Sequence, residues 1–595
     1  MDADELQHLH FVLSSTPTTN WTIHITHIQG VSGVLIPASA QHGRSPLRKR
    51  LQLPQPQPPP LLTLCHLQSQ ASPLPANLPF RLVSKTIGSG AYASIRKATP
   101  LTSPTPLIAV KFIHKDHAFR TGRLRPKQLL IEISLHKTVS GHDNVIRYLS
   151  HSTEDSAWVW IALELAEGGD LFDKIEADVG VGEDVAHFYF AQLVSAVEWC
   201  HGRGVAHRDV KPENLLVSGS GDLKLADFGL ATQFLEPKGG GRKVCGMVCG
   251  SPPYIAPEIL AVGRANQGRG KEEARAGYDP AAADVWSVAI VLFVLLAGNT
   301  PWDSPVMGES YEFHEYVTSN GRPTDELWTK VPAEAMGLVT GMLCVDVPAR
   351  MGLQDVKRHP WFTKRNPHLN AKGKAANPVG LATQLLEGLH IDFSAEPPVS
   401  QSQNTDMDMD IDTPRPSQPQ PPTTPAPQTT DWEPSQASQL PTGFHSTQQA
   451  RDFLLSLADD PAMSQFAPSP SFPLTLTQQA RQFKDILPSS SLAKFYSKQP
   501  LPALLAQLEA AFRRLEVVGT EAEAEGEGRV RVWVQAVDGR GQALKGNVLV
   551  EKIAGGEEEV MEVRFLKAQG DPVGWRRLFK RVVVLCREGL VRGPG

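Results

Sequence analysis

Four polar residues near the middle of this chain have the types and spacing needed to move a phosphoryl group. Asp209, Lys211 and Asn214 lie in the stretch HRDVKPEN, and Asp227 follows in the triplet DFG. A carboxylate such as Asp209 can orient an acceptor hydroxyl and take its proton, and a lysine such as Lys211 can steady the moving phosphoryl group. Carboxamide and carboxylate oxygens are ligands that Mg²⁺ accepts. We therefore expect Asp209 and Lys211 to be catalytic, and Asn214 and Asp227 to hold the metal.

A glycine-rich segment upstream has the composition of a phosphate cover. It reads IGSGAYASI and lies between two β-prone runs. Gly88 and Gly90 allow the backbone to approach phosphates closely, whereas Ala93 stands where a third glycine is usual. We expect this segment, including Ile87 and Ile95, to contact ATP.

Lys111 and Glu132 have the spacing of a lysine that holds nucleotide phosphates and the glutamate that orients it. Lys111 ends the run AVK, and Glu132 lies in the helical segment KQLLIEISLHKTV. A solvated helix glutamate is the alternative for Glu132. Ala109, beside Lys111, is expected at the nucleotide as well. His136 follows on the same helix, and we expect a structural role for it.

The segment LELA is expected to link two lobes and to bind adenine. Backbone groups near Glu164 and Ala166 would hydrogen-bond the base, and Leu163 would guard the pocket behind it. Asp170 could meet the ribose or cap a helix. Leu216 completes the expected ATP contacts.

Composition divides the chain into four parts. Residues 1–78 carry a polyproline-like tract and are expected to be disordered, as is the Pro-, Ser-, Thr- and Gln-rich segment 366–488. Residues 79–365 begin with short β-prone runs and continue with helical patterns. Residues 489–595 alternate amphipathic helix and strand patterns. The fold class is therefore α+β: a β-rich lobe, a helical lobe, a linker and a small α+β C-terminal module.

The overall composition indicates a soluble intracellular protein. Net charge is −5, so no general nucleic-acid binding is expected. The six cysteines are few and scattered, and we expect free thiols rather than a zinc site. The apolar run that begins at Val285 is shorter than the roughly 20 residues that span a bilayer, which favours a buried core helix.

Together these motifs identify a protein kinase, and further stretches narrow the resemblance. LFDKIEADVGV, HRDVKPENLL, DFGLATQF and CGSPPYIAPE resemble the DNA-damage checkpoint effector kinases, the checkpoint kinase one family within the calcium/calmodulin-kinase-like group. The resemblance implies the bilobal kinase fold, with ATP and Mg²⁺ as cofactors and proteins as substrates. It also implies that Ser251 helps to bind substrate, that Glu258 pairs with Arg350, and that Asp284 holds the catalytic-loop backbone.

The activation segment lacks the usual phosphorylation site. Between Asp227 and Ser251 the only hydroxyl side chain is Thr232, and Met247 and Val248 stand where related energy-sensing and polarity kinases have a threonine. Arg208 would then have no phosphate to bind, and we expect the kinase domain by itself to be active without an upstream kinase. A kinase of that energy-sensing or polarity type remains the closest alternative, and a pseudokinase scaffold is a more distant one.

Two features suggest how substrates and regulators are recognised. Glu213 matches the residue with which basic-directed kinases hold an arginine three positions before the target. The linker is rich in Ser-Gln and Thr-Gln pairs, which phosphatidylinositol-3-kinase-like checkpoint kinases recognise in this family. Of these pairs, Thr447 and Ser464 are the preferred phosphosites because each lies beside an apolar stretch. Eight of the pairs begin at Ser400, Ser402, Ser417, Ser435, Ser438, Thr447, Ser464 and Thr477.

The C-terminal module resembles the kinase-associated domain of this family, which implies an intramolecular contact that restrains the kinase. Its basic helix also permits binding of anionic lipid, which would make the module an adaptor. The expected location is the nucleus, with a cytoplasmic pool. A basic cluster, Arg44 to Arg50, could be an import signal or a solvated charge cluster.

Overall fold

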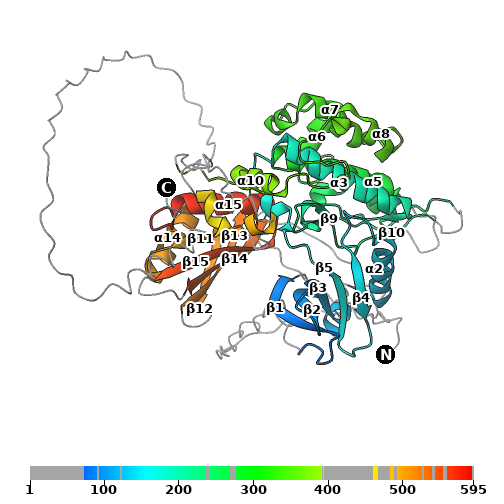
Figure 1. Cartoon of the computed structure of the whole chain (residues 1–595). Coiled ribbons are helices and arrows are strands. Elements are labelled where there is room, and N and C mark those ends of the chain that lie inside the picture. Colours follow the sequence, from blue (N-terminus) through cyan, green and yellow to red (C-terminus); the bar gives the residue numbers. More distant parts are fainter. Residues whose placement is uncertain are drawn as a thin grey trace, which may run out of the picture. The chain divides into compact units, whose positions relative to one another are not determined.

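The computed structural model describes most of the chain after Pro73 (Figure 1). The described residues are 73–89, 93–120, 124–235, 241–268, 276–391, 393, 460–466, 483–487, 492–524, 528–538, 543–553 and 559–591. Gly90, Thr447 and most of the segments expected to be disordered lie outside these ranges.

The N-terminal lobe is an antiparallel five-stranded sheet with the order β1-β2-β3-β5-β4. Side chains alternate between its two faces, as strand geometry requires. In β3, Val110 and Phe112 join one buried cluster and Ile113 joins another. Lys111 and Ile113 therefore share a face. The strands are β1 (Phe80–Ser89), β2 (Ala93–Pro100), β3 (Ile108–His114), β4 (Tyr148–Ser152) and β5 (Trp158–Glu164).

Helix α2 (Pro126–Val139) covers the face of the sheet that carries Lys111. Its first residue is a proline, which suits the first turn of a helix because no backbone N–H is needed there. Leu129 and Ile133 pack with Ile113 in one buried cluster. This packing turns Glu132, which lies next to Ile133, toward the cleft side of the lobe, where it meets Lys111.

The C-terminal lobe is built around α5 (Pro280–Ala297). Asp279 caps its first turn by accepting a hydrogen bond from the Ala281 N–H, and Gly298 ends it with a left-handed backbone at φ 70°. α5 is apolar enough to cross a membrane by length and composition, but 94% of its apolar window is buried in the protein. It is a core helix, as its sequence predicted.

Further helices surround α5 in this lobe (Figure 1). Helix α3 packs directly against α5. These helices are α3 (Glu183–Gly202), α4 (Pro257–Asn266), α6 (Tyr311–Thr318), α7 (Ala333–Met342), α8 (Leu353–Arg358), α9 (Pro360–Thr363) and α10 (Pro378–Gly388).

A short hairpin brings together the two residues expected to hold the metal. Strand β8 (Leu215–Val217) pairs antiparallel with β9 (Leu223–Leu225). Asn214 directly precedes β8, and Asp227 follows shortly after β9. Because the strands run in opposite directions, both residues lie at the same end of the hairpin.

The C-terminal module is a second antiparallel five-stranded sheet with two helices. Its order is β11-β15-β14-β13-β12, and residues from the sheet and both helices share one core. Strands β11 and β12 were not expected from the sequence. The elements are β11 (Lys494–Ser497), α14 (Leu501–Arg514), β12 (Val518–Ala524), β13 (Arg529–Val537), β14 (Ala543–Ile553), β15 (Val560–Gln569) and α15 (Pro572–Leu585). The expected fold class, a bilobal kinase with a small α+β module, is confirmed.

Three ordered segments lie inside 366–488, where composition predicted a disordered linker, and here the structure differs from that expectation. Helix α10, the turn η7 (Pro461–Phe466) and the helix α13 (Phe483–Ile486) are all described. Each buries apolar side chains, among them Leu385, Phe466 and Phe483. Average composition misses such segments because a few apolar residues suffice when a neighbouring domain supplies the rest of the core.

Candidate active site

A buried carboxylate fixes the backbone of the catalytic loop. Asp284 on α5 is 0% exposed, and it accepts hydrogen bonds from the N–H groups of His207 (2.8 Å) and Arg208 (2.7 Å). His201 contacts the same carboxylate at 2.8 Å. Burial alone would raise the pKa of Asp284, but the hydrogen bonds and the nearby histidines lower it below the usual range. The ionised carboxylate thus holds Arg208 at φ 63°, a left-handed conformation that is costly without such support.

Asp209, Lys211 and Ser251 form one hydrogen-bonded group beyond this anchor. Lys211 Nζ lies 2.9 Å from Asp209 Oδ2 and donates to Ser251 Oγ at 2.7 Å. Ser251 Oγ in turn donates to Asp209 Oδ1 at 3.0 Å. A carboxylate held this way can orient an incoming hydroxyl and accept its proton, while the ammonium group faces the same place. Ser251 thereby ties the activation segment to the catalytic loop.

Asn214 and Asp227 supply oxygen atoms that suit Mg²⁺. Asn214 Nδ2 donates to the backbone oxygen of Asp209 (2.8 Å) and to its Oδ2 (3.0 Å), which leaves the amide oxygen as a ligand. The Asp227 side chain is 54% exposed. The charge of Lys111 lowers the pKa of Asp227 to about 2, so the carboxylate is ionised at neutral pH. Hard carboxylate and amide oxygens fit Mg²⁺, which usually also binds substrate phosphates.

The expected pair of Lys111 and Glu132 is formed. Lys111 Nζ donates to Glu132 Oε1 at 2.8 Å, and it also reaches Asp227 Oδ1 at 3.4 Å. The Lys111 and Glu132 side chains are largely buried. The lysine is thus fixed between α2 and the DFG segment, where its ammonium group can bind nucleotide phosphates. Bound Mg·ATP would supply the γ-phosphoryl group for transfer.

Four of the residues expected near the nucleotide form two backbone pairs. Ala109 pairs with Leu163 across the β3–β5 ladder, and Leu216 pairs with Asp170. Ala166 lies in the connection that follows β5 and is buried.

Two acidic side chains in and just after the link between the lobes form ion pairs or hydrogen bonds within the protein. Glu164 forms an ion pair with Lys224 at 2.7 Å. Asp170 Oδ1 accepts a hydrogen bond from the Phe172 N–H at 2.7 Å, so it caps the turn that follows. Burial, together with the neighbouring charge of Asp173, raises the pKa of Asp170 well above its usual range. This hydrogen bond closes a local turn, and the ribose contact expected for Asp170 stays a prediction.

The glycine-rich segment is described at its two ends. Gly88 pairs with Ile95 across the β1–β2 ladder, and Ala93 begins β2. The Ile87 side chain is exposed on β1. Gly90 lies outside the described residues.

Tyr278 contacts the arginine that binds an activating phosphate in many kinases. Arg208 Nη1 donates to the Tyr278 hydroxyl at 3.4 Å, and Arg208 Nε donates to Leu230 O at 2.8 Å. The same hydroxyl donates to Met247 O at 2.9 Å. The backbone of Tyr278 also exchanges both hydrogen bonds with Cys245. Tyr278 thus fixes the position of the activation segment. It lies in an insert that follows Ala256-Pro257-Glu258, and its role was not predicted from the sequence.

The other expected structural pair is also formed. Arg350 makes a two-point contact with Glu258, with distances of 2.7 and 2.9 Å. Arg350 also donates to the backbone oxygens of Ala282 and Cys344. Since Glu258 lies in the first turn of α4, directly after the activation segment, this pair fixes the end of that segment to the core.

His136 is a packing residue between α2 and the DFG segment. Its Nε2 lies 2.8 Å from Ile146 O, and its ring centre lies 4.8 Å from that of Phe228. Burial lowers the pKa of His136 to about 4. The imidazole is therefore neutral near pH 7, which agrees with the structural role expected for it.

This burial makes the stability of the kinase domain depend on pH. The pKa of His136 is lower in the folded chain than in the unfolded chain, so folding is penalised as the pH falls through about 6.5 toward 4. Between pH 7.5 and 5.0 the penalty amounts to about 2 kcal/mol. His136→Leu should remove that part of the loss. Urea unfolding of both chains at the two pH values checks this, and an equal loss in both would contradict it.

Comparison with known proteins agrees with this geometry. Residues 82–362 match the family model described as the protein kinase domain. The chain is 34% identical to the serine/threonine-protein kinase chk1 of Schizosaccharomyces pombe, over 85% of this chain and 96% of that protein. It is 34% identical to the serine/threonine-protein kinase CHK1 of Saccharomyces cerevisiae, over 87% of this chain and 98% of that one.

A second group of relatives matches a smaller part of the chain. CBL-interacting protein kinase 20 of Oryza sativa is 35% identical over 47% of this chain and 57% of its own length. The two yeast proteins, in contrast, align with nearly their whole length and with far more of this chain than the catalytic lobes alone. The chain therefore belongs to the Chk1 family of serine/threonine protein kinases.

Proposed function

We propose that this serine/threonine kinase acts in DNA-damage and replication checkpoint signalling, where it phosphorylates proteins that carry arginine three residues before the target. The similarity to the two yeast Chk1 proteins along almost the whole chain is the observation that carries this proposal. The expected location is the nucleus. The upstream activator would be a phosphatidylinositol-3-kinase-like kinase that modifies Ser-Gln and Thr-Gln pairs, including Thr447 and Ser464.

Activity without phosphorylation of the activation segment is part of the proposal. In kinases that need this phosphate, it pairs with the arginine of the HRD motif and orders the segment. Here the Tyr278 hydroxyl and Leu230 O accept hydrogen bonds from Arg208 instead. Because Tyr278 also bonds Met247 O, one neutral side chain joins the arginine to the segment.

The preference for arginine would come from Glu213. Its Oε2 is buried and has no hydrogen-bond partner among the described residues, and burial raises the pKa of this carboxyl. A buried carboxylate oxygen without a partner is costly, and a guanidinium group would relieve that cost. Glu213 directly precedes Asn214 in the catalytic loop, so an arginine bound there lies close to the acceptor site.

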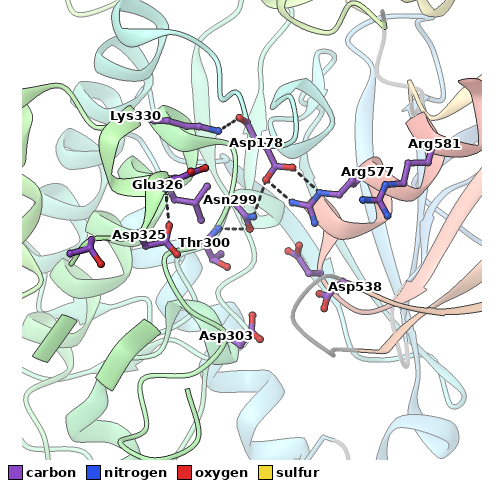
Figure 2. Close-up of a pocket in the computed structure, with 13 residues that line it drawn as sticks. Asp178, Asn299, Thr300, Asp303, Asp325, Glu326, Lys330, Asp538, Arg577 and Arg581 are labelled. Carbon is purple, nitrogen blue, oxygen red and sulfur yellow. Dashed lines mark hydrogen bonds and ion pairs between the residues drawn. The ribbon is translucent and has the colours of Figure 1, made fainter. Parts of the chain in front are cut away.

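The C-terminal module is proposed to restrain the kinase by binding next to this site. Arg577 on α15 donates to both carboxylate oxygens of Asp178, at 2.7 and 2.6 Å (Figure 2). Arg576 and Lys580 both contact the buried Glu176. These pairs join α15 to the segment of the catalytic domain that lies between the short turn η2 (Phe172–Lys174) and α3.

An apolar contact with the catalytic domain and a charge that acts on Glu213 accompany these ion pairs. Val573, at the start of α15, is 1% exposed and clusters with Phe172 and Ala177. The charge of Lys567, at the end of β15, acts on the Glu213 carboxyl. A peptide substrate that needs Glu213 would compete with this contact, so the restraint should act on peptide binding.

Lipid binding by α15 is a second candidate that uses the same residues. Arg576, Arg577 and Lys580 are all engaged with acidic residues of the catalytic domain. Arg581 and Arg577 both line a cavity that Asp178 also lines (Figure 2). An anionic membrane would compete with Glu176 and Asp178 for these cations, so lipid binding would accompany release of the restraint.

The role of Tyr278 predicts how activity responds to phosphatase and to mutation. The fragment of residues 75–391 should keep its activity after phosphatase treatment, whereas Tyr278→Phe in the same fragment should lower kcat/KM roughly tenfold, because it removes hydrogen bonds at a buried arginine. Tyr311→Phe is the matched control, since Tyr311 is 77% exposed. Loss of activity after phosphatase treatment, or equal effects of the two substitutions, would contradict the prediction.

The role of Glu213 predicts a change in peptide selectivity. Glu213→Gln should lower kcat/KM for a peptide with arginine at −3 by roughly 10- to 100-fold, because a charge-assisted hydrogen bond is lost. The same substitution should change little for a peptide with alanine at −3. Steady-state kinetics with the two peptides measures this, and an equal loss for both would refute the arginine site.

The ion pair between the module and the catalytic domain predicts an activating mutation. Asp178→Arg in the full chain should raise peptide phosphorylation about tenfold, which corresponds to about 1.4 kcal/mol of lost restraint. Adding Arg577→Asp should restore the lower activity, because the pair forms again with reversed charges. Unchanged activity in Asp178→Arg, or no restoration by the second substitution, would show that this pair does not restrain the kinase.

A further inference from the structure

The Ser464-Gln465 pair belongs to a turn that is packed into the C-terminal module. The turn η7 (Pro461–Phe466) follows Asp460, which contacts Lys494 and the Tyr496 hydroxyl on β11. Met463 and Phe466 join the core that contains both helices and the sheet of the module. The segment is therefore held to the module on both sides of Ser464.

The side-chain amide and the backbone oxygen of Gln465 all form hydrogen bonds. It is 1% exposed. Its Oε1 accepts a hydrogen bond from Arg576 Nη2 at 2.7 Å, and its Nε2 donates to Leu492 O at 2.8 Å. Its backbone oxygen accepts from the Ile391 N–H at 2.8 Å. Both ends of the side-chain amide are thus in use inside the module.

Arg576 depends on this glutamine. Its other contacts through Nη2, to Glu176 Oε2 and Leu389 O, are both 3.4 Å long. Within the described part of the chain, its buried Nε and Nη1 have no hydrogen-bond partner. A buried guanidinium is costly unless it is well paired. Gln465 therefore stabilises the one arginine of α15 that touches the linker, the module and Glu176 of the catalytic domain.

We propose that Gln465 has two mutually exclusive uses: it locks the η7 turn to Arg576, and it is the residue that a Ser/Thr-Gln-directed kinase reads when it modifies Ser464. This inference rests on the proposed phosphorylation of Ser464. An enzyme that recognises the glutamine must contact its amide, yet both amide atoms are already bonded and covered. Ser464 can then be modified only after the turn has left the module.

The rate at which Ser464 is phosphorylated would then report how often the η7 turn leaves the module. When opening and closing are fast, the rate of attack on a protected segment follows the population of the open form. The rate at Ser464 should therefore depend on the residues that hold η7. Arg576→Ala should raise it, because the amide of Gln465 loses its charged partner. Glu176→Gln should not, because the contact between Arg576 and Gln465 remains.

The test compares two substrates of a Ser/Thr-Gln-directed kinase. One is the full chain carrying Asp209→Asn, which prevents self-phosphorylation, and the other is a synthetic peptide of residues 430–471. Both contain Ser438, so quantitative mass spectrometry can give the ratio of the rates at Ser464 and Ser438 in each. We expect this ratio to be at least about tenfold lower in the full chain than in the peptide. Arg576→Ala should bring it close to the peptide value.

Controls distinguish failure of the inference about Gln465 from failure of the proposed phosphorylation of Ser464. Phe466→Ala, made in both chain and peptide, releases the turn by a second route if Arg576→Ala does not fold. Equal ratios in chain and peptide, or a rise with Glu176→Gln as large as with Arg576→Ala, would overturn the inference and leave the proposed phosphosite standing. No modification of Ser464 even in the peptide would overturn both.

Discussion

The catalytic centre depends on the buried carboxylate of Asp284. Two consecutive backbone N–H groups of the catalytic loop end on it, and this fixes a left-handed residue next to Asp209. A charge in this position is tolerable only because hydrogen bonds surround it. Asp209, the next residue of the loop, accepts a hydrogen bond from Ser251 in the activation segment. The Tyr278 hydroxyl makes a second contact with this segment by donating to Met247 O. Positioning, with no covalent intermediate, is what such a scaffold provides for phosphoryl transfer.

Acidic residues of the catalytic domain have a part in both proposed interactions, with the C-terminal module and with the substrate. Two of them lie in the segment just before α3. Glu176 and Asp178 pair with basic residues of α15, and Glu213 Oε2 has no hydrogen-bond partner among the described residues. In the proposed function, the first two carboxylates hold the module and the third binds the substrate arginine. Gln465 follows the same pattern, since its amide is bonded inside the module and is also the feature expected to be read by an upstream kinase.

The sequence predicted the parts of the site that are local, and it missed those that depend on distant partners. The HRD and DFG motifs are contiguous, and the strand and helix patterns placed Lys111 and Glu132 on facing elements, so their pairing followed. Tyr278 lies in an insert without periodicity, and only the fold brings its hydroxyl to Arg208.

The turn at Ser464 was missed for a related reason. Its apolar residues are too few to predict order by themselves, and Arg576, the partner of Gln465, lies far along the chain. The capping role of Asp170 was left open because one aspartate can serve a ribose or a turn equally well from its sequence position.

The most direct test is phosphoryl transfer from ATP to an Arg-x-x-Ser peptide by residues 75–391 and by the full chain, each beside its Asp209→Asn variant. The shorter fragment keeps α10, which packs into the core of the helical lobe. Higher activity in the fragment than in the full chain, abolished by Asp209→Asn in both, is the expected result. Activity that survives Asp209→Asn would contradict the assigned chemistry, and equal activity of fragment and full chain would contradict the restraint by the C-terminal module.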